Sequence, residues 1–303
     1  MRISTSQLNR DTIAQIQDRA AAVGRASQQV STGLKAERFE DLATDLTQLL
    51  NLEDVKLNTA TYQKNIATAQ GRLRASEQAL NTIQDIAIQA RTLGLSGANP
   101  NSAEVRASLA PTVEGYLKNF DALLNSTFEG RYLFSGQAAT IAPINTLSAP
   151  QTPAPYPGAG PSSAYYQGDQ ERLKIISSAN VTFEYGLTAD EPAFAQIRAG
   201  LQALWYGLQN NDTTEINSGI QALQASQSAL GGLFGELGGS QAGLDLIAAR
   251  HDENEDFLQE RITGLKEVDV TEAISRFTEE QNAFQASLLV LSRLNQVRLI
   301  DYL

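Results

Sequence analysis

The sequence predicts a mainly α-helical protein. We expect long antiparallel helical rods, paired as a coiled coil by both termini, with a β-hairpin and a small β-rich insertion in the middle. Two distributions support this prediction: all nine prolines lie between Pro100 and Pro192, and 13 of the 20 aromatic residues lie between Tyr116 and Tyr206. Because proline destabilises a helix interior by about 3 kcal/mol, both ends of the chain can form long helices and the middle cannot.

Apolar residues recur every three or four positions along the N-terminal third, which is the spacing of a narrow coiled-coil seam. Two runs of this kind predict two rods, and Gly94, Gly97 and Pro100 are expected to end the second. The first run is Ile13, Ile16, Ala20, Val23, Ser27, Val30 and Leu34. The second run is Ile66, Ala69, Leu73, Ser76, Leu80, Ile83, Ala87 and Ala90.

The C-terminal third has the same spacing. Leu244, Ile247, Leu258 and Leu265 share one seam, and the segment Asp269-Val-Thr-Glu272 is a capping box that begins the last helix. That helix is expected to carry an apolar stripe of Val270, Ile274, Phe277, Gln281, Phe284, Leu288, Leu291 and Asn295. The chain stays apolar to its last residue, which indicates that this end is buried against something.

The middle of the chain contains the strand signals. Apolar and polar residues alternate over 181–185, and 173–176 is the expected partner strand. Residues 132–134 lie between two glycines and predict a further short strand. Residues 143–163 are rich in Pro, Ala, Ser and Gly and predict an exposed loop.

Two more helices are expected before the last rod. Phe194, Ile197, Leu201, Leu204 and Leu208 indicate a short amphipathic helix, and a second helix is expected over 213–230. We expect the glycine-rich stretch 231–243 to be a connection between that second helix and the last rod.

Composition excludes several kinds of function. The net charge of −11 argues against binding to a nucleic acid or to an anionic membrane surface. Zero cysteines exclude disulfides, thiol catalysis and cysteine–zinc sites, and one histidine excludes a two-histidine metal site. We therefore expect no catalytic residue, no cofactor and no metal. The N-terminus has no apolar segment of a secretory signal, which alone predicts a cytoplasmic protein, although export that uses an uncleaved N-terminus stays open.

Two groups of residues are candidates for a functional site. His251 and Glu255 are four residues apart on one helix face, and we interpret them as part of a solvated face rather than half of a metal site. The second group is aromatic and could form a sugar-binding platform, but the core of a small β-domain is the favoured interpretation. It comprises Tyr165, Tyr166, Phe183, Tyr185, Trp205 and Tyr206.

The seams are the positive signal for function. One alternative is an ordinary bundle in which both arms pack within the monomer. The other is that the outermost ~35 residues at each end bury too little apolar surface to be stable alone and fold by packing on neighbouring copies. The assembly interface expected from the second alternative is Ile13, Ile16, Val23, Val30, Ile274, Phe277, Phe284, Leu288, Leu291 and Leu303.

The motifs in these arms resemble the flagellin superfamily. The resemblance is carried at the N-terminal end by residues 1–5 (MRIST) and 31–33 (STG), and at the C-terminal end by 268–273 (VDVTEA) and 285–287 (QAS). The segment Gly130-Arg-Tyr-Leu-Phe-Ser-Gly136 is similar to the motif of the hook-associated protein 3 family, whose members join the flagellar hook to the filament, rather than to that of filament flagellins.

The resemblance implies three domains: a terminal coiled coil of 1–40 and 266–303, a helical rod with a hairpin from 41–140 and 191–265, and an outer β-rich domain of 141–190. It also implies an extracellular, structural role in the bacterial flagellum after export without a cleaved signal. The implied partners are further copies in a ring, hook-associated protein 1, flagellin, and an export chaperone on the C-terminal helix. A minor flagellin is the alternative, and a surface glycan-binding protein is a more distant one.

Overall fold

The computed structural model describes residues 5–35, 46–99, 102–145 and 151–300. Within these ranges the chain forms six helices and two antiparallel hairpins, which confirms the predicted fold class. The helices are α1 (Thr5–Thr32), α2 (Leu46–Ala98), α3 (Ala103–Leu124), α4 (Pro192–Asn210), α5 (Thr213–Lys266) and α6 (Val270–Ile300). The strands are β1 (Thr127–Phe128), β2 (Arg131–Tyr132), β3 (Leu173–Ser178) and β4 (Val181–Tyr185). No apolar stretch in these helices is long enough to cross a membrane.

The chain divides into two compact units. The terminal unit holds residues 1–58 and 253–303, and the central unit holds residues 59–252. The expected insertion, 141–190, is part of the central unit. The finer division of the chain into three domains stays a prediction.

The core of the central unit is built on α2. All eight residues of the second predicted seam, Ile66 to Ala90, are buried, and none of them is more than 3% exposed. All of them except Ser76 join one apolar cluster with residues of α3, α4 and α5. Polar pairs also join α2 to α5, because the side-chain amides of Gln63 and Gln70 donate to Asp252 and Asp245 at 2.7 Å.

Helix α4 lies against this core as the sequence predicts. Its five predicted apolar residues are completely buried. The ring of Phe194 packs against those of Phe120 and Phe134, with centroid distances of 6.5 and 5.8 Å. A buried ion pair accompanies these rings, since Nε of Arg198 on α4 donates to Asp121 of α3 at 3.2 Å.

The glycine-rich stretch 231–243 is not a connection, so that prediction is wrong. It is the middle of α5, which is one helix of 54 residues. Leu230, Leu233, Leu237 and Leu244 are buried at helical spacing on one face. Five of the glycines lie on the exposed side, where a Cβ atom would meet nothing within 4 Å. Burial of the leucines therefore outweighs the low helix propensity of glycine, which costs about 1 kcal/mol per residue relative to alanine.

The two hairpins follow the sequence in part. β3 pairs with β4 as predicted, with an irregularity at Ser177 between the pairs of Ile176 and Ser178. The strand expected over 132–134 is only partly correct. The paired strand is β2, whereas Leu133 and Phe134 are in the core.

The expected exposed loop 143–163 is bound to the helices, so that prediction is wrong in part. Pro143 and Ile144 are buried. The Gln202 side chain donates to the carbonyl of Thr152 at 3.1 Å, and the backbone N–H of Tyr156 donates to Glu215 at 2.8 Å. Residues 146–150 lie outside the described part of the chain.

Candidate assembly interface

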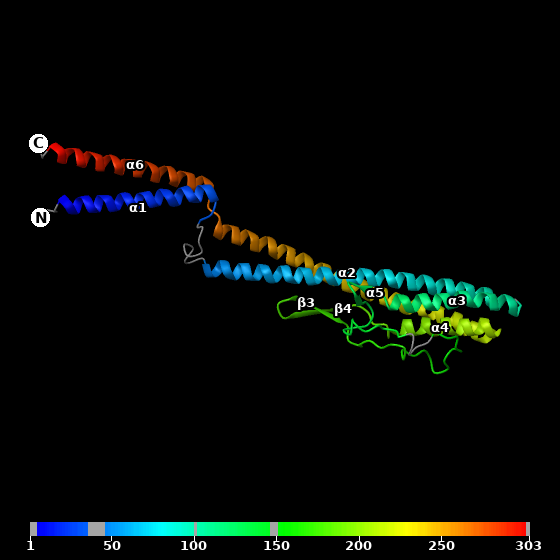
Figure 1. Ribbon diagram of the computed structural model, residues 1–303. Coiled ribbons are helices and arrows are strands. Elements are labelled where there is room, and N and C mark those ends of the chain that lie inside the picture. The colour runs from blue at the N-terminus through cyan, green and yellow to red at the C-terminus, as the bar shows by residue number, and fades with distance from the viewer. Residues whose placement is uncertain (1–4, 36–45, 100–101, 146–150, 301–303) are drawn as a thin grey trace. The chain divides into compact units, whose positions relative to one another are not determined.

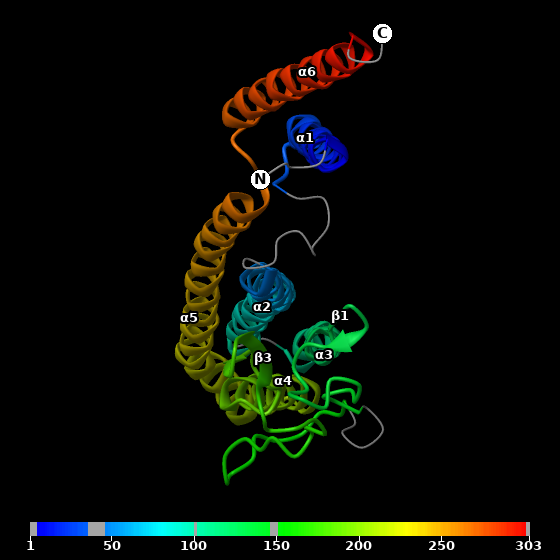
Figure 2. The ribbon, with the colours of Figure 1, turned by 90° about the vertical axis from the view of Figure 1, so that its left-hand side faces the viewer.

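Helices α1 and α6 lie side by side and antiparallel in the terminal unit, with the two chain ends at the same end of the pair (Figure 1). The turned view shows the same two helices as neighbours (Figure 2). On α6, covered residues recur at steps of three and four, and on α1 they follow the same period with a gap of seven at the exposed Arg19, so one line of side chains on each helix faces the other. On α1 these are Ile16, Val23, Ala26 and Val30. On α6 they are Ala273, Phe277, Glu280, Phe284, Ser287 and Leu291.

The contact between α1 and α6 uses only part of the apolar surface that the sequence predicts. Ile16, Val23, Val30, Phe277, Phe284 and Leu291 are half-buried along it. The other predicted residues remain exposed: Ile13 at 47%, Ile274 at 48% and Leu288 at 43%. Leu303 lies outside the described residues. The apolar stripe of each helix is thus wider than the contact between the two helices.

The first predicted seam is wrong at two positions, where the structure turns the preceding residue toward α6. Ala20 and Ser27 are exposed, while Ala26 is buried. Arg19 lies seven residues, or about two helical turns, before Ala26. It forms an ion pair with Glu280 at 2.9 Å. The sequence pattern missed this polar pair because a seam was sought among apolar residues alone.

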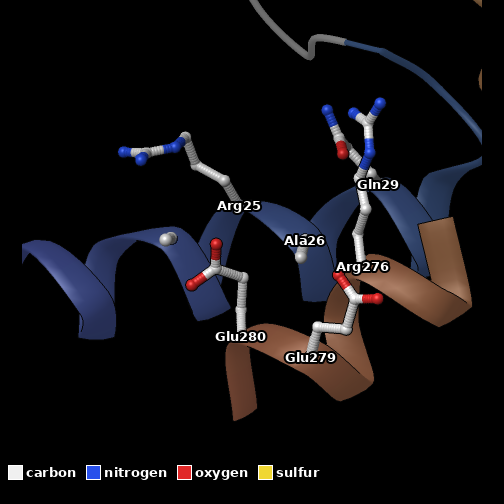
Figure 3. A pocket seen from close by; sticks show the side chains of 7 residues that line it. Arg25, Ala26, Gln29, Arg276, Glu279 and Glu280 are labelled. Atoms are coloured by element: carbon white, nitrogen blue, oxygen red, sulfur yellow. The ribbon is translucent and has the colours of Figure 1, made fainter. Parts of the chain in front are cut away.

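Small side chains leave the α1–α6 contact loosely packed. A hollow of about 260 Å³ lies beside Ala22 and Ala26. Its polar rim consists of Arg25, Gln29, Arg276, Glu279 and Glu280, and Figure 3 shows Glu280 turned from α6 toward α1. The two arginines balance the two carboxylates, so the hollow selects neither an anion nor a cation. Weak packing of this kind gives little stability to the helix pair itself.

The turns at the base of α1 and α6 are bound to each other. Gly33 ends α1 at a φ of +71°, a conformation that glycine adopts readily. Its carbonyl accepts from the N–H of Val268 at 2.9 Å, and the N–H of Lys35 donates to the carbonyl of Lys266 at 2.8 Å. These two hydrogen bonds join the segment that follows α1 to the segment that precedes α6.

Asp269 caps α6 as the sequence predicts. Its carboxylate accepts from the backbone N–H groups of Thr271 at 2.8 Å and Glu272 at 3.3 Å. The hydrogen bonds from Glu272 and Thr271 lower the pKa of Asp269 below its usual value. The carboxylate of Glu272 accepts from Arg276 instead of completing a capping box.

His251 is buried, so the prediction of a solvated face is wrong for this residue. Its Nε2 lies 2.6 Å from the carbonyl oxygen of Ser177, and its ring centroid lies 5.8 Å from that of Tyr62. Since a carbonyl only accepts, Nε2 carries a proton and donates it. His251 thus anchors the β3–β4 hairpin to α5. Among the described residues, no three His, Cys, Asp or Glu side chains are grouped so as to hold a metal ion.

The aromatic residues weighed as a sugar platform are mostly part of the core. Tyr165 and Tyr185 are buried, and Tyr166, Phe183 and Trp205 pack against the central cluster. Burial also raises the pKa of Tyr165, whose hydroxyl donates to the carbonyl of Ala189 at 2.8 Å. The favoured interpretation, a core role, is confirmed for these five residues.

The fold is that of a helical rod protein in which both chain ends share one unit and a small β-rich insertion interrupts the sequence between the rods. The family model of the bacterial flagellin N-terminal helical region matches residues 3–139, and that of the flagellin C-terminal helical region matches residues 213–303. Together these matches span most of the chain. The chain belongs to the flagellin family.

Two solved structures share this fold. One is a putative flagellar hook-associated protein from Vibrio parahaemolyticus, with 24% identity and a TM-score of 0.59 over 72% of this chain and 96% of that one. The other is FlgL of Bacillus cereus, with 16% identity and a TM-score of 0.57 over 70% of this chain and 98% of that one. No curated protein sequence matches the chain.

Proposed function

We propose that this chain is a structural subunit of the bacterial flagellum that polymerises between the hook and the filament. The observation that carries the proposal is the excess apolar surface on α1 and α6. Ile13, Ile274 and Leu288 are exposed in the single chain although they continue the stripes through which the two helices pack. Contact with adjacent copies would bury them, and a fully buried leucine contributes about 1.5–3 kcal/mol.

The junction, rather than the filament, is favoured by two observations. Both similar structures carry hook-associated or FlgL titles. The segment 130–136 also resembles the junction-protein motif, and its residues have structural roles in the fold. Gly130 has a φ of +74° in the β1–β2 turn, Phe134 is completely buried, and a Cβ atom on Gly136 would collide with the carbonyl oxygen of Asp169.

The finer parts of the proposal follow from the same role. Copies form a ring whose neighbours are hook-associated protein 1 on one side and flagellin on the other. The subunit leaves the cell through the flagellar export apparatus without a cleaved signal, and an export chaperone covers the apolar surface of α6 before secretion. The role is structural and requires no cofactor or catalytic residue.

The test is a single substitution on the exposed stripe. Leu288→Asp should leave the central unit folded but abolish assembly, because every interface in the ring would bury an unpaired carboxylate. Cells should then shed unpolymerised flagellin into the medium. Thr271→Asp is the matched control, since it adds the same charge in the first turn of α6, where acidic residues are favourable.

The measurement is filament formation on cells that secrete equal amounts of the two variants, because the chaperone would use the same surface. Normal filaments with Leu288→Asp would overturn the proposed assembly surface. Long filaments formed by the purified protein alone would favour a filament subunit over a junction protein.

A further inference from the structure

The terminal unit contains a second exposed apolar surface, away from the α1–α6 contact. It lies on the segment that we call the neck, residues 46–58 of α2 and 253–266 of α5. The neck buries Leu49, Leu258 and Ile262. It exposes Leu50 at 53% and Leu57 at 68%, although leucine in a two-helix segment gains stability only when it is covered.

The exposed leucines of the neck share a helix face with a carboxylate. Leu50, Asp54 and Leu57 are separated by steps of four and three, which places them in one row on α2. Asp54 accepts a hydrogen bond from the side chain of Asn58 at 3.2 Å, and no ion pair of Asp54 occurs in the described ranges. The row therefore presents apolar surface on both sides of a negative charge.

Helix α6 carries a complementary row near its C-terminal end. Leu289 is 63% exposed, and Arg293 follows four residues later on the same face. Neither residue is on the line that faces α1, which passes through Ser287 and Leu291. In the part of the chain that the structure describes, Arg293 makes no ion pair.

We propose that the Leu289–Arg293 row of one copy packs on the Leu50–Asp54–Leu57 row of the next copy. Leucine would cover leucine, and the arginine would pair with Asp54. The step from Leu289 to Arg293 spans about 6 Å of helix, against about 6 Å from Leu50 to Asp54 and about 4.5 Å from Asp54 to Leu57, so either leucine lies within reach of Leu289 when Arg293 pairs with Asp54. Arg293 lies next to an exposed leucine as Asp54 does, so the two rows are opposite in charge and alike in apolar surface.

This contact would join two different surfaces, so it would be heterologous. Contacts of this kind repeat from copy to copy and generate a closed ring or an open helix rather than a dimer. The inference thus deepens the proposed function, on which it rests, by naming the surfaces through which successive copies meet.

Cysteine cross-linking tests the contact directly, because the natural chain has no cysteine. Full-length Leu57→Cys and Leu289→Cys chains are made separately, one with a tag, then mixed under assembly conditions and oxidised. Any disulfide between the two kinds of chain joins two copies. We expect about tenfold more of it than between Leu289→Cys and Leu246→Cys, because contact raises the effective concentration of the thiols.

The control positions are matched for exposure. Leu246 is 65% exposed and lies in the central unit, and Phe257 is 57% exposed on the α5 side of the neck. Equal cross-linking of Leu289→Cys to Leu57→Cys and to Leu246→Cys would overturn the contact. Preferential cross-linking to Phe257→Cys would also overturn it, because the partner row would then be on α5.

A charge exchange tests the ion pair. Arg293→Glu should weaken assembly about tenfold or more by opposing Asp54 with a like charge, and Asp54→Lys in the same chain should restore it. Asp85→Lys, at an exposed carboxylate of α2 in the central unit, should not restore it. Failure of the rescue by Asp54→Lys while the wild-type chain assembles would overturn this contact and leave the proposed function standing. Normal junctions with Leu288→Asp would instead overturn the assembly surface on α1 and α6 that carries the proposed function.

Discussion

The main apolar seam of the central unit is completely covered, and the apolar stripes of the terminal unit are covered only in part. In the central unit, every residue of the α2 seam from Ile66 to Ala90 is buried beneath α3, α4 and α5. In the terminal unit, α1 packs against α6. Ile13, Ile274 and Leu288 stay exposed beside this contact. From this difference we expect that the central unit folds by itself and propose that the terminal unit reaches full burial only when copies of the chain come together.

The largest expected difference between the two units is in the loss of stability when a phenylalanine of each unit is replaced by alanine. Phe194→Ala, at a completely buried residue of the central unit, should lower the free energy of unfolding by about 3–5 kcal/mol. Phe277→Ala, at a half-buried residue of α6, should cost about 1 kcal/mol in the monomer. The measurement is urea denaturation of the purified chain, with amide hydrogen exchange to separate the units.

Equal losses for Phe194→Ala and Phe277→Ala would mean that the terminal unit is packed as well as the central one. Strong exchange protection of α1 and α6 in a verified monomer would lead to the same conclusion. Either result would remove the physical reason for assembly through these helices.

A smaller effect, in the opposite direction, is expected in α5. Gly235→Ala and Gly238→Ala should each stabilise the central unit by about 0.4–1 kcal/mol, because their Cβ atoms would meet open space and alanine restricts the unfolded chain. Gly243→Ala is the matched control, since its Cβ atom would lie 3.0 Å from the ring of Phe183 and should bring no gain. Thermal unfolding of the three variants measures the difference. A gain at Gly243 equal to that at Gly235 would show that open space is not the cause.

The smallest expected effect is on amide exchange at the start of α6, where Asp269 caps the helix in the terminal unit. Asp269→Ala should speed amide exchange in the first turn of α6, whereas Asp269→Asn should not, because asparagine also caps helices. The pKa of Asp269 is lower in the folded chain than its unfolded value of about 3.9, so its contribution is complete above that value. The contribution is lost as the pH falls through the lowered pKa.

Exchange measured between pH 5 and pH 2 should therefore reveal a loss of protection at the start of α6 that the Asp269→Asn variant does not share. Identical pH profiles for the two proteins would contradict this account of the cap. The central unit provides an internal reference in the same sample.

The sequence predicts the fold best where burial is deep. The seam from Ile66 to Ala90 and the five apolar residues of α4 are all as expected, because a well-covered helix leaves an unambiguous apolar period. The sequence predicts the face of α1 that contacts α6 less well. Ala20 and Ser27 are almost as plausible on that face as Arg19 and Ala26, because all four residues are small or polar. A choice between steps of three and four then depends on the partner helix, which the sequence of α1 does not contain.

The other errors have different physical causes. The glycines of 231–243 favour a connection between two helices when they are considered alone. The leucines between them keep helical spacing, and this spacing indicates the helix that the structure shows. His251 was placed in solvent because its partner is a backbone carbonyl at Ser177, 74 residues away. No local pattern contains such a contact. The candidate assembly interface stays a prediction about the assembled state.

The anchoring of β3 has a consequence for how crowded copies behave. A ribbon of two strands has two open edges, and an open edge can recruit a strand from another molecule and begin aggregation. Here the carbonyls of Ile176 and Ser177 already accept hydrogen bonds from Asn65 on α2 and His251 on α5. These side chains occupy acceptors that an invading strand would need. At this point the edge of β3 is shielded against pairing with a strand of another copy.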